Sequence, residues 1–163
     1  MTRESWSLTA AALAAIEEHG RSAYPEECCG FLVAPATKTP DGHRQIEQAI
    51  PTPNRATADR NRRYVIDPLE LLRVERAVAP TAVVVGIYHS HPDHPAVPSE
   101  YDRERAWPWY SYLVLSVPRV GAPTIGAFEW DPTTRQFHPR RLRIEGAAPS
   151  GPPGTRKDGT EKL

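Results

Sequence analysis

The chain of 163 residues has only two cysteines, which are adjacent, at positions 28 and 29. Adjacent cysteines cannot cross-link distant parts of a chain, so a disulfide framework of the kind found in small secreted proteins is excluded. The sequence contains no apolar run near the ~20 residues that a transmembrane helix requires. Residues 1–6 lack the apolar core of a signal peptide. We therefore expect a cytoplasmic protein that has no membrane partner.

An excess of charge of one sign is also absent, because 20 Lys and Arg balance 20 Asp and Glu. This balance argues against a general binder of nucleic acid or of a membrane surface, since both attract strongly basic proteins. The length suffices for one domain with a hydrophobic core. From about residue 146 the composition shifts to Gly, Pro, Ala, Ser, Lys and Asp. We predict a folded domain over residues 1–145 and a disordered tail over residues 146–163.

The hydrophobic pattern predicts a single mixed α/β (α+β) domain. A helix is expected over residues 10–19, with Ser7 or Thr9 as its N-cap and Gly20 as its stop. A second helix should begin after Asp67, an N-cap that proline follows. The remaining elements are a short helix over 99–106 and strands over 28–34, 44–50, 83–88, 110–117, 124–130 and 137–144. This order indicates a largely antiparallel sheet with helices outside it.

Two histidines follow the apolar run 83–88 directly, at positions 89 and 91. Residues i and i+2 of a strand point to the same face, so His89 and His91 can reach one ion. Asp102, eleven residues after His91, supplies a third, anionic ligand. This set leaves the fourth position of a tetrahedral zinc open, as in catalytic sites. Iron or manganese would accept the same ligands, and zinc is the better match.

Each of these residues also has a purely structural interpretation. The histidines could lie on the surface at a strand end, and Asp102 could be only the N3 acid of a helix capped by Ser99. A helix that begins at Ser99 would hold Asp102 one turn away, so capping and metal binding are compatible. The Ser99 hydroxyl could also donate a hydrogen bond to a developing oxyanion. Asp93 and His94 are interpreted as loop residues, because three ligands are already found.

A metal-bound water requires a general base from elsewhere in the chain. Glu26 and Glu27 lie just before the strand expected over residues 28–34. Composition does not choose between them, and an acidic pair on the surface is the ordinary interpretation of both.

The stretch His-Ser-His, seven residues, Ser, two residues, Asp resembles the signature of the JAMM (MPN-plus) zinc metalloproteases. The family pattern includes an upstream Glu-x-x-Gly, which the residues from Glu27 to Gly30 match. The resemblance covers roughly residues 8–145. It implies a curved, mostly antiparallel β-sheet flanked by helices, similar in outline to cytidine deaminases. Deaminases themselves carry His-x-Glu and a later Pro-Cys-x-x-Cys. This chain has His-Ser-His and no Cys-x-x-Cys, so the deaminase class is excluded.

The resemblance also assigns roles to the motif residues. It implies that Glu27, rather than Glu26, is the general base and proton shuttle. It implies that Ser99 helps to stabilise the tetrahedral intermediate. One zinc ion per chain would be held by His89, His91 and Asp102.

Family members divide by substrate. Those that remove ubiquitin from lysine carry long insertions, some with an extra zinc, and this chain has little room for one between Asp102 and Tyr110. The segments 100–104 and 107–110 instead resemble small bacterial members, several of which act on ubiquitin-like sulfur-carrier proteins ending in Gly-Gly. The resemblance implies hydrolysis of the bond after that diglycine, with release of cysteine or a short extension. An isopeptidase that removes a ubiquitin-like modifier is the alternative, and a non-catalytic scaffold is disfavoured by the complete motif.

Several features outside the motif carry weaker interpretations. The basic loop over residues 51–63 is expected to be solvated, with contact to a carrier's tail as the alternative. The aromatic segment 107–110 could line the cleft or only pack. Cys28 and Cys29 are expected to be inert and buried, a vicinal disulfide or regulatory thiol at Cys28 being the alternative. A homodimer is a candidate assembly.

Overall fold

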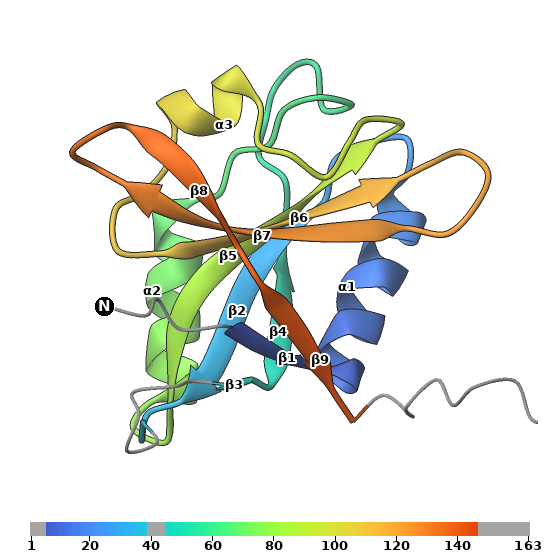
Figure 1. Ribbon diagram of the computed structural model, residues 1–163. Helices are drawn as coiled ribbons and strands as arrows, with labels where there is room; N and C mark the ends of the chain where they lie inside the picture. The colour runs from blue at the N-terminus through green and yellow to red at the C-terminus, as the bar shows by residue number, and fades with distance from the viewer. Residues whose placement is uncertain (1–5, 39–44, 147–163) are drawn as a thin grey trace, which may run out of the picture.

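The computed structural model of the protein describes residues 6–38 and 45–146 (Figure 1). Apart from Gly146, the tail predicted over residues 146–163 lies outside the described residues. None of the described helices is long and apolar enough to cross a membrane. The predicted mixed α/β architecture is confirmed, with helices flanking a central sheet.

The central sheet has six strands and carries the candidate site. In spatial order the strands are β4 (Gln48–Thr52), β2 (Cys29–Pro35), β5 (Ala82–Pro92), β6 (Ser111–Val117), β7 (Thr124–Asp131) and β8 (Gln136–Arg140). Neighbouring strands are antiparallel except β5 and β6, which are parallel. The chain crosses from β5 to β6 through a loop and a short helix, α3 (Glu100–Glu104). This crossover brings Asp102 of α3 back to the end of β5, where His89 and His91 lie.

A second, three-stranded sheet was not predicted. Its strands are β3 (Gln45–Ile46), β1 (Trp6–Thr9) and β9 (Leu142–Glu145), with β1 parallel to both neighbours. The single strands expected over residues 44–50 and 137–144 are each divided between the two sheets. The four residues of β1 are too few to show a period, and their partners lie far away in the sequence. Hydrophobic pattern alone therefore could not identify this strand.

The first helix, α1 (Ala10–Ala23), runs past the residue predicted to stop it. Thr9 is its N-cap and accepts a hydrogen bond from the Ala12 amide at 3.1 Å. Gly20 is buried within the helix, and a Cβ there would lie 2.6 Å from Leu115 Cδ2. The prediction that Gly20 ends the helix is wrong, because this glycine allows close packing of α1 on β6 instead.

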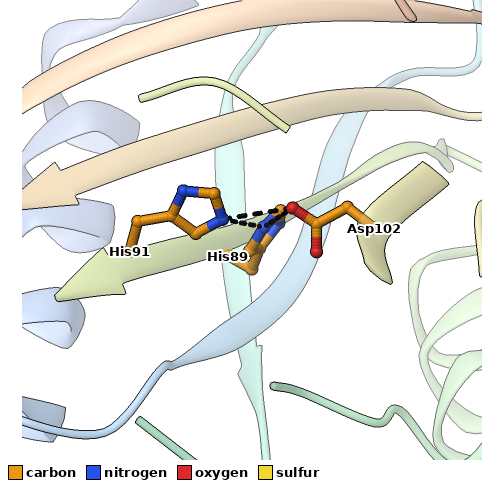
Figure 2. A group of neighbouring side chains, drawn as sticks. All are labelled: His89, His91 and Asp102. Atoms are coloured by element: carbon orange, nitrogen blue, oxygen red, sulfur yellow. Dashed lines mark hydrogen bonds and ion pairs between the residues drawn. The ribbon is translucent and has the colours of Figure 1, made fainter. Parts of the chain in front are cut away.

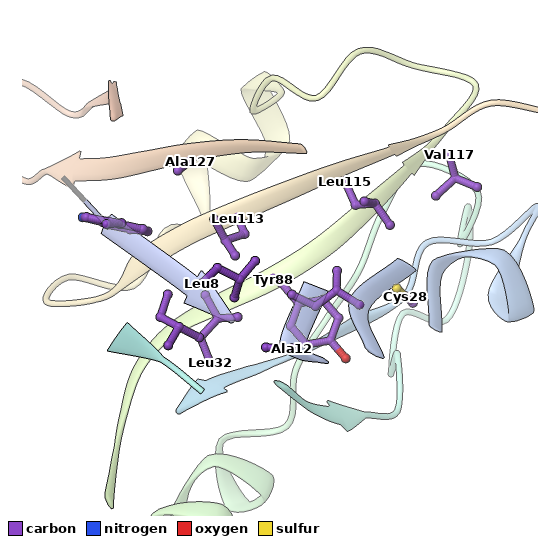
Figure 3. Packing of buried hydrophobic residues seen from close by; sticks show 12 residues of the cluster. Leu8, Ala12, Cys28, Leu32, Tyr88, Leu113, Leu115, Val117 and Ala127 are labelled. Carbon is purple, nitrogen blue, oxygen red and sulfur yellow. The ribbon is translucent and has the colours of Figure 1, made fainter. Parts of the chain in front are cut away.

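The two long helices lie on opposite sides of the central sheet (Figure 1). On the α1 side, Ala12 and Ile16 pack with Leu32 and Tyr88 in the larger core cluster (Figure 3). The second long helix is α2 (Pro68–Val78), which Asp67 caps as predicted. A second cluster on its side of the sheet contains Cys29, Phe31, Ile66, Val74, Ile87 and Tyr112. Strand alternation places the side chains of odd-numbered residues near the end of β5 on this second side.

Candidate metal centre and active site

Three predicted ligands converge at the end of β5 (Figure 2). His89 and His91 both lie within the strand and are buried, and buried Asp102 comes from α3. The two Nε2 atoms are 3.0 Å apart, and Asp102 Oδ2 lies 3.0 Å from His89 Nε2 and 3.1 Å from His91 Nε2. Ligand atoms bound to one tetrahedral zinc at the usual bond lengths lie roughly 3.3 Å apart. The three side chains therefore fit around a single metal ion with little change.

A backbone carbonyl fixes the tautomer of His91. His91 Nδ1 lies 2.9 Å from the carbonyl oxygen of Pro95, which can only accept a hydrogen bond. Nδ1 must therefore carry the proton, and the lone pair of a neutral imidazole is left on Nε2. Metal-binding histidines are commonly oriented in this way by a hydrogen bond to their second nitrogen.

His89 has no such hydrogen bond. Its Nδ1 is buried and has no hydrogen-bond partner within residues 6–38 and 45–146. The ring instead stacks on the side chain of Tyr64, with ring centroids 4.4 Å apart and planes inclined by 24°. Sequence reasoning missed this contact, because Tyr64 lies 25 residues away in a polar segment that has no periodic pattern.

Asp102 also takes part in the capping of α3. Ser99 Oγ accepts a hydrogen bond from the Asp102 amide at 3.1 Å, and the Ser99 amide donates to Asp102 Oδ2 at 2.8 Å. The predicted capping and the convergence on the histidines thus coexist. Burial alone would raise the pKa of Asp102, yet the adjacent imidazoles, His89 first, hold that pKa well below its usual range. Asp102 is therefore an anion at neutral pH.

Glu27 is buried beside the three ligands, whereas Glu26 is exposed. Glu27 Oε1 lies 3.9 Å from His91 Nε2, and the Glu26 carboxylate makes a long ion pair with Arg60, at 4.0 Å. Burial raises the pKa of the Glu27 carboxyl to about 8. Its Oε2 is buried and has no hydrogen-bond partner in the described part of the chain. A carboxyl group with a pKa near neutrality can both take and release a proton, so Glu27 is suitably placed for proton transfer beside the three ligands.

The glycine of the Glu-x-x-Gly stretch has a steric role. A Cβ on Gly30 would lie 2.4 Å from the Tyr88 ring and 2.5 Å from the Ile50 carbonyl oxygen. The bare backbone of Gly30 therefore allows β2 to lie close to β4 and β5. This packing brings the preceding Glu27 to the end of β5.

A groove of about 540 Å³ lies against the metal centre. Glu27, His91 and Ser99 line it together with arginines 62 and 63 and a wall of loop residues, which are His94, Pro95, Val97 and Pro98. Two residues of the basic loop predicted to be solvated thus border the candidate site. Both of these arginines are already paired with Asp59, at 3.8 and 3.7 Å.

The loop residues Asp93 and His94 and the tryptophans of segment 107–110 are not part of the group of candidate metal ligands. Asp93 accepts hydrogen bonds from the Tyr24 hydroxyl at 2.5 Å and the Arg119 amide at 2.7 Å. His94 contributes to the groove wall. Trp107 packs in the α2-side cluster, whereas the Trp109 side chain is 91% exposed.

Comparison with known proteins identifies one family model and several relatives that match this chain. The family model for prokaryotic homologs of the JAB domain matches residues 9–132. A protein named desampylase from Haloferax volcanii is 38% identical over 122 residues, which cover 71% of this chain and 84% of that protein. A probable TtuB-protein conjugate cleaving protease from Thermus thermophilus is 40% identical over 82 residues, 50% of this chain and 55% of that protein. A CysO-cysteine peptidase from Mycobacterium tuberculosis is 36% identical over 103 residues, 62% and 65% of the two chains.

Solved structures agree with the family match. A protein from Desulfitobacterium hafniense superposes with a TM-score of 0.72 at 26% identity, covering 86% of this chain and 92% of that one. A protein from Salinibacter ruber gives a TM-score of 0.63 at 36% identity, covering 91% and 96%. A JAB1/MPN domain protein from Archaeoglobus fulgidus, at 18% identity and a TM-score of 0.54, covers 85% and 97% and shows the shared fold. The chain therefore belongs to the family of prokaryotic homologs of the JAB domain, as its JAMM-like motif predicted.

Proposed function

We propose that this protein is a zinc-dependent peptidase that hydrolyses the bond after the C-terminal Gly-Gly of a ubiquitin-like or sulfur-carrier protein. One observation carries the proposal: three buried ligand atoms lie within 3.1 Å of one another, beside a buried carboxylate and an open groove. The printed names of three relatives, a desampylase, a conjugate cleaving protease and a CysO-cysteine peptidase, support a hydrolase of this kind.

In the proposed site His89, His91 and Asp102 would hold one zinc ion. Zinc bound there would polarise the scissile carbonyl and lower the pKa of a bound water. Glu27 takes the proton of the attacking water at its carboxylate and delivers it to the leaving amine. The Ser99 hydroxyl, whose oxygen accepts from the Asp102 amide, keeps its proton free to donate to the oxyanion.

The groove favours an extended, narrow substrate segment. A diglycine has no side chains, so its backbone can pass close to Glu27 and Ser99 without displacing the groove wall. The residues before the diglycine would lie along the groove, where arginines 62 and 63 offer contacts to polar or acidic groups. A ubiquitin-like carrier with a free Gly-Gly tail meets these requirements.

An isopeptidase that removes a ubiquitin-like modifier from conjugates is a second candidate. It is favoured by the Thermus thermophilus relative, whose name states that it cleaves protein conjugates. Both candidates use the same catalytic residues and differ in the group that leaves.

A single incubation tests the proposed activity. The zinc-loaded protein is mixed with a carrier protein extended past Gly-Gly, and the products are weighed by mass spectrometry. We expect a product that ends at the second glycine, and no product after chelation. In the Glu27→Gln variant we expect a rate at least about 100-fold lower with zinc still bound, whereas the neighbouring Glu26→Gln variant keeps its rate. Full activity of Glu27→Gln with zinc bound would disprove the assigned mechanism.

A further inference from the structure

A second and much smaller hollow adjoins the candidate metal centre. It measures about 90 Å³, and its lining includes Asp102, Tyr64, Tyr101, Arg105 and Trp107. Tyr101 also lines the groove, so its side chain lies at the border of both spaces. We refer to this second space as the small pocket. Because Asp102 lines it, the small pocket lies directly beside the candidate metal centre.

Arg105 supplies the positive charge of the small pocket. It follows Asp102 by three residues at the end of α3, and residues with this spacing lie on the same helix face. Its guanidinium carbon lies 4.5 Å from the centroid of the Tyr101 ring, and that of Arg63 lies 5.2 Å from the same ring. Tyr101 therefore contacts one cation that borders the groove and another that borders the small pocket.

The charge of Arg105 is unpaired in the described part of the chain. Within residues 6–38 and 45–146, no carboxylate forms an ion pair with Arg105, whereas Arg63 is paired with Asp59 and Arg103 with Glu100. An arginine held on an aromatic ring beside a reaction site, with its charge free, is suited to bind a carboxylate. Asp102 also lines the pocket, but its carboxylate faces the two histidines and would bind the ion, so Arg105 is left to favour an anion on a small group.

The sizes of the two spaces decide which part of a substrate each can hold. The small pocket of about 90 Å³ is far smaller than the groove, so it suits a short part of a substrate, such as one small residue. The groove of about 540 Å³ can take several residues of an extended tail. A substrate that crosses the metal centre would place its longer part in the groove and a single residue in the small pocket.

We propose that the small pocket binds the one residue that leaves after the diglycine, and that Arg105 recognises its terminal carboxylate. This inference rests on the proposed function and narrows its substrate class. A carrier extended by a single residue has a carboxylate at that position. The side-chain amine of a lysine within a conjugate has none. Arg105 would therefore favour carriers with a one-residue extension over isopeptide conjugates.

Peptide binding to the zinc-loaded Glu27→Gln variant tests this inference without cleavage. Two fluorescein-labelled peptides end in Gly-Gly-Ala, one with a free carboxylate and one with an amide. Dissociation constants are measured by anisotropy, with NMR titration for weak binding. We expect the free acid to bind about tenfold more tightly, as for a hydrogen-bonded ion pair near the surface. Arg105→Gln should reduce the ratio to about one, whereas the matched control Arg103→Gln should leave it unchanged.

Three outcomes would overturn the inference. They are equal affinity for acid and amide, a preference that survives Arg105→Gln, and equally tight binding of a peptide that ends in Gly-Gly-Glu-amide. The last would move recognition from a terminal carboxylate to an acidic side chain. Cleavage of the free-acid peptide by the wild-type protein is a separate measurement, and its failure would count against the proposed function while the binding ratio still judges the pocket.

Discussion

The two imidazoles of the candidate metal centre are held in different ways by different regions. His91 is oriented by a hydrogen bond to Pro95, in the loop that directly follows its own strand. His89 is oriented by stacking on Tyr64, which comes from the distant segment 54–66. A hydrogen bond fixes both tautomer and ring direction, whereas stacking fixes only the ring plane. The two ligands thus depend on separate parts of the molecule.

Each of these regions has its own anchor. The 92–99 loop is held by Asp93, whose amide donates to the Val117 carbonyl at 2.9 Å and whose carboxylate accepts from Tyr24. The 54–66 segment is held by Asn54, which accepts from the Val65 amide at 3.1 Å and donates to the Glu27 carbonyl at 3.1 Å. Asn54 therefore connects the support of His89 with the position of the proposed base.

The largest expected effect comes from removing either imidazole. His89→Ala and His91→Ala should each lower zinc affinity by at least about 100-fold, because each deletes a ligand. Competition with a chromophoric chelator measures the affinity, and peptide cleavage should stop in both variants. His94→Ala, in the groove wall, is the matched control and should keep its zinc. Retention of tight zinc binding by either ligand variant would refute the assigned set.

The next largest effect is expected from loss of the stacking between Tyr64 and His89. Tyr64→Leu should weaken zinc binding by roughly 10-fold, as loss of groups that orient a ligand commonly does. Tyr64→Phe keeps the ring and should stay within about threefold of the wild type. The absorption spectrum of the cobalt-substituted protein should shift in the leucine variant alone. If both variants behave like the wild type, stacking does not orient His89.

A smaller effect is expected from removing either anchor, and its size should differ between Asn54 and Asp93. Asn54→Ala should destabilise the protein by about 1–2 kcal/mol, because it leaves several partly buried backbone groups without partners. Thermal unfolding measures this loss. In Asp93→Asn the residue keeps a side chain tolerant of its φ of 56°, so the loss should be smaller than in Asn54→Ala and come from the weaker contact with Tyr24. Equal loss in the two variants would remove the distinction between the anchors.

The smallest effect concerns the exposed edge of the 92–99 loop. Ser116 Oγ donates to the His94 carbonyl at 2.6 Å in an exposed position. Ser116→Ala should cost less than about 1 kcal/mol, because water can replace the lost donor. Zinc content should be unchanged. A marked loss of zinc in this variant would mean that the loop is held less firmly than its hydrogen bonds indicate.

The parts of the site that could be predicted from the sequence are those that depend on local spacing. The His-x-His spacing on a strand, the distance to Asp102 and the serine cap are local patterns, and the structure brings these side chains together as expected. The position of Glu27 required a resemblance, because residues alone did not distinguish it from Glu26. Tyr64 could not be predicted, since no spacing rule relates a loop residue to a strand that follows 25 residues later.

The features of the fold that the sequence did not predict also depend on contacts between distant parts of the chain. The preference of glycine for helix ends predicts that Gly20 stops the helix. In the structure Gly20 instead allows close contact with Leu115, on a strand that comes much later in the chain. The parallel pairing of β1 with β9 joins residues near the two ends of the described chain. Such contacts depend on the whole fold, and a single sequence carries no local signal for them.

The helix α3 has only five residues, and a helix of that length has no stability of its own. Asp102 both caps this helix and would bind the ion, so the two events are thermodynamically linked. We therefore expect occupancy of the metal centre to stabilise α3, and with it Tyr101 and Arg105 on the same short segment. By reciprocity, a peptide that contacts these residues should tighten the hold on the ion. The protein would then bind its cofactor most firmly while a substrate is in place.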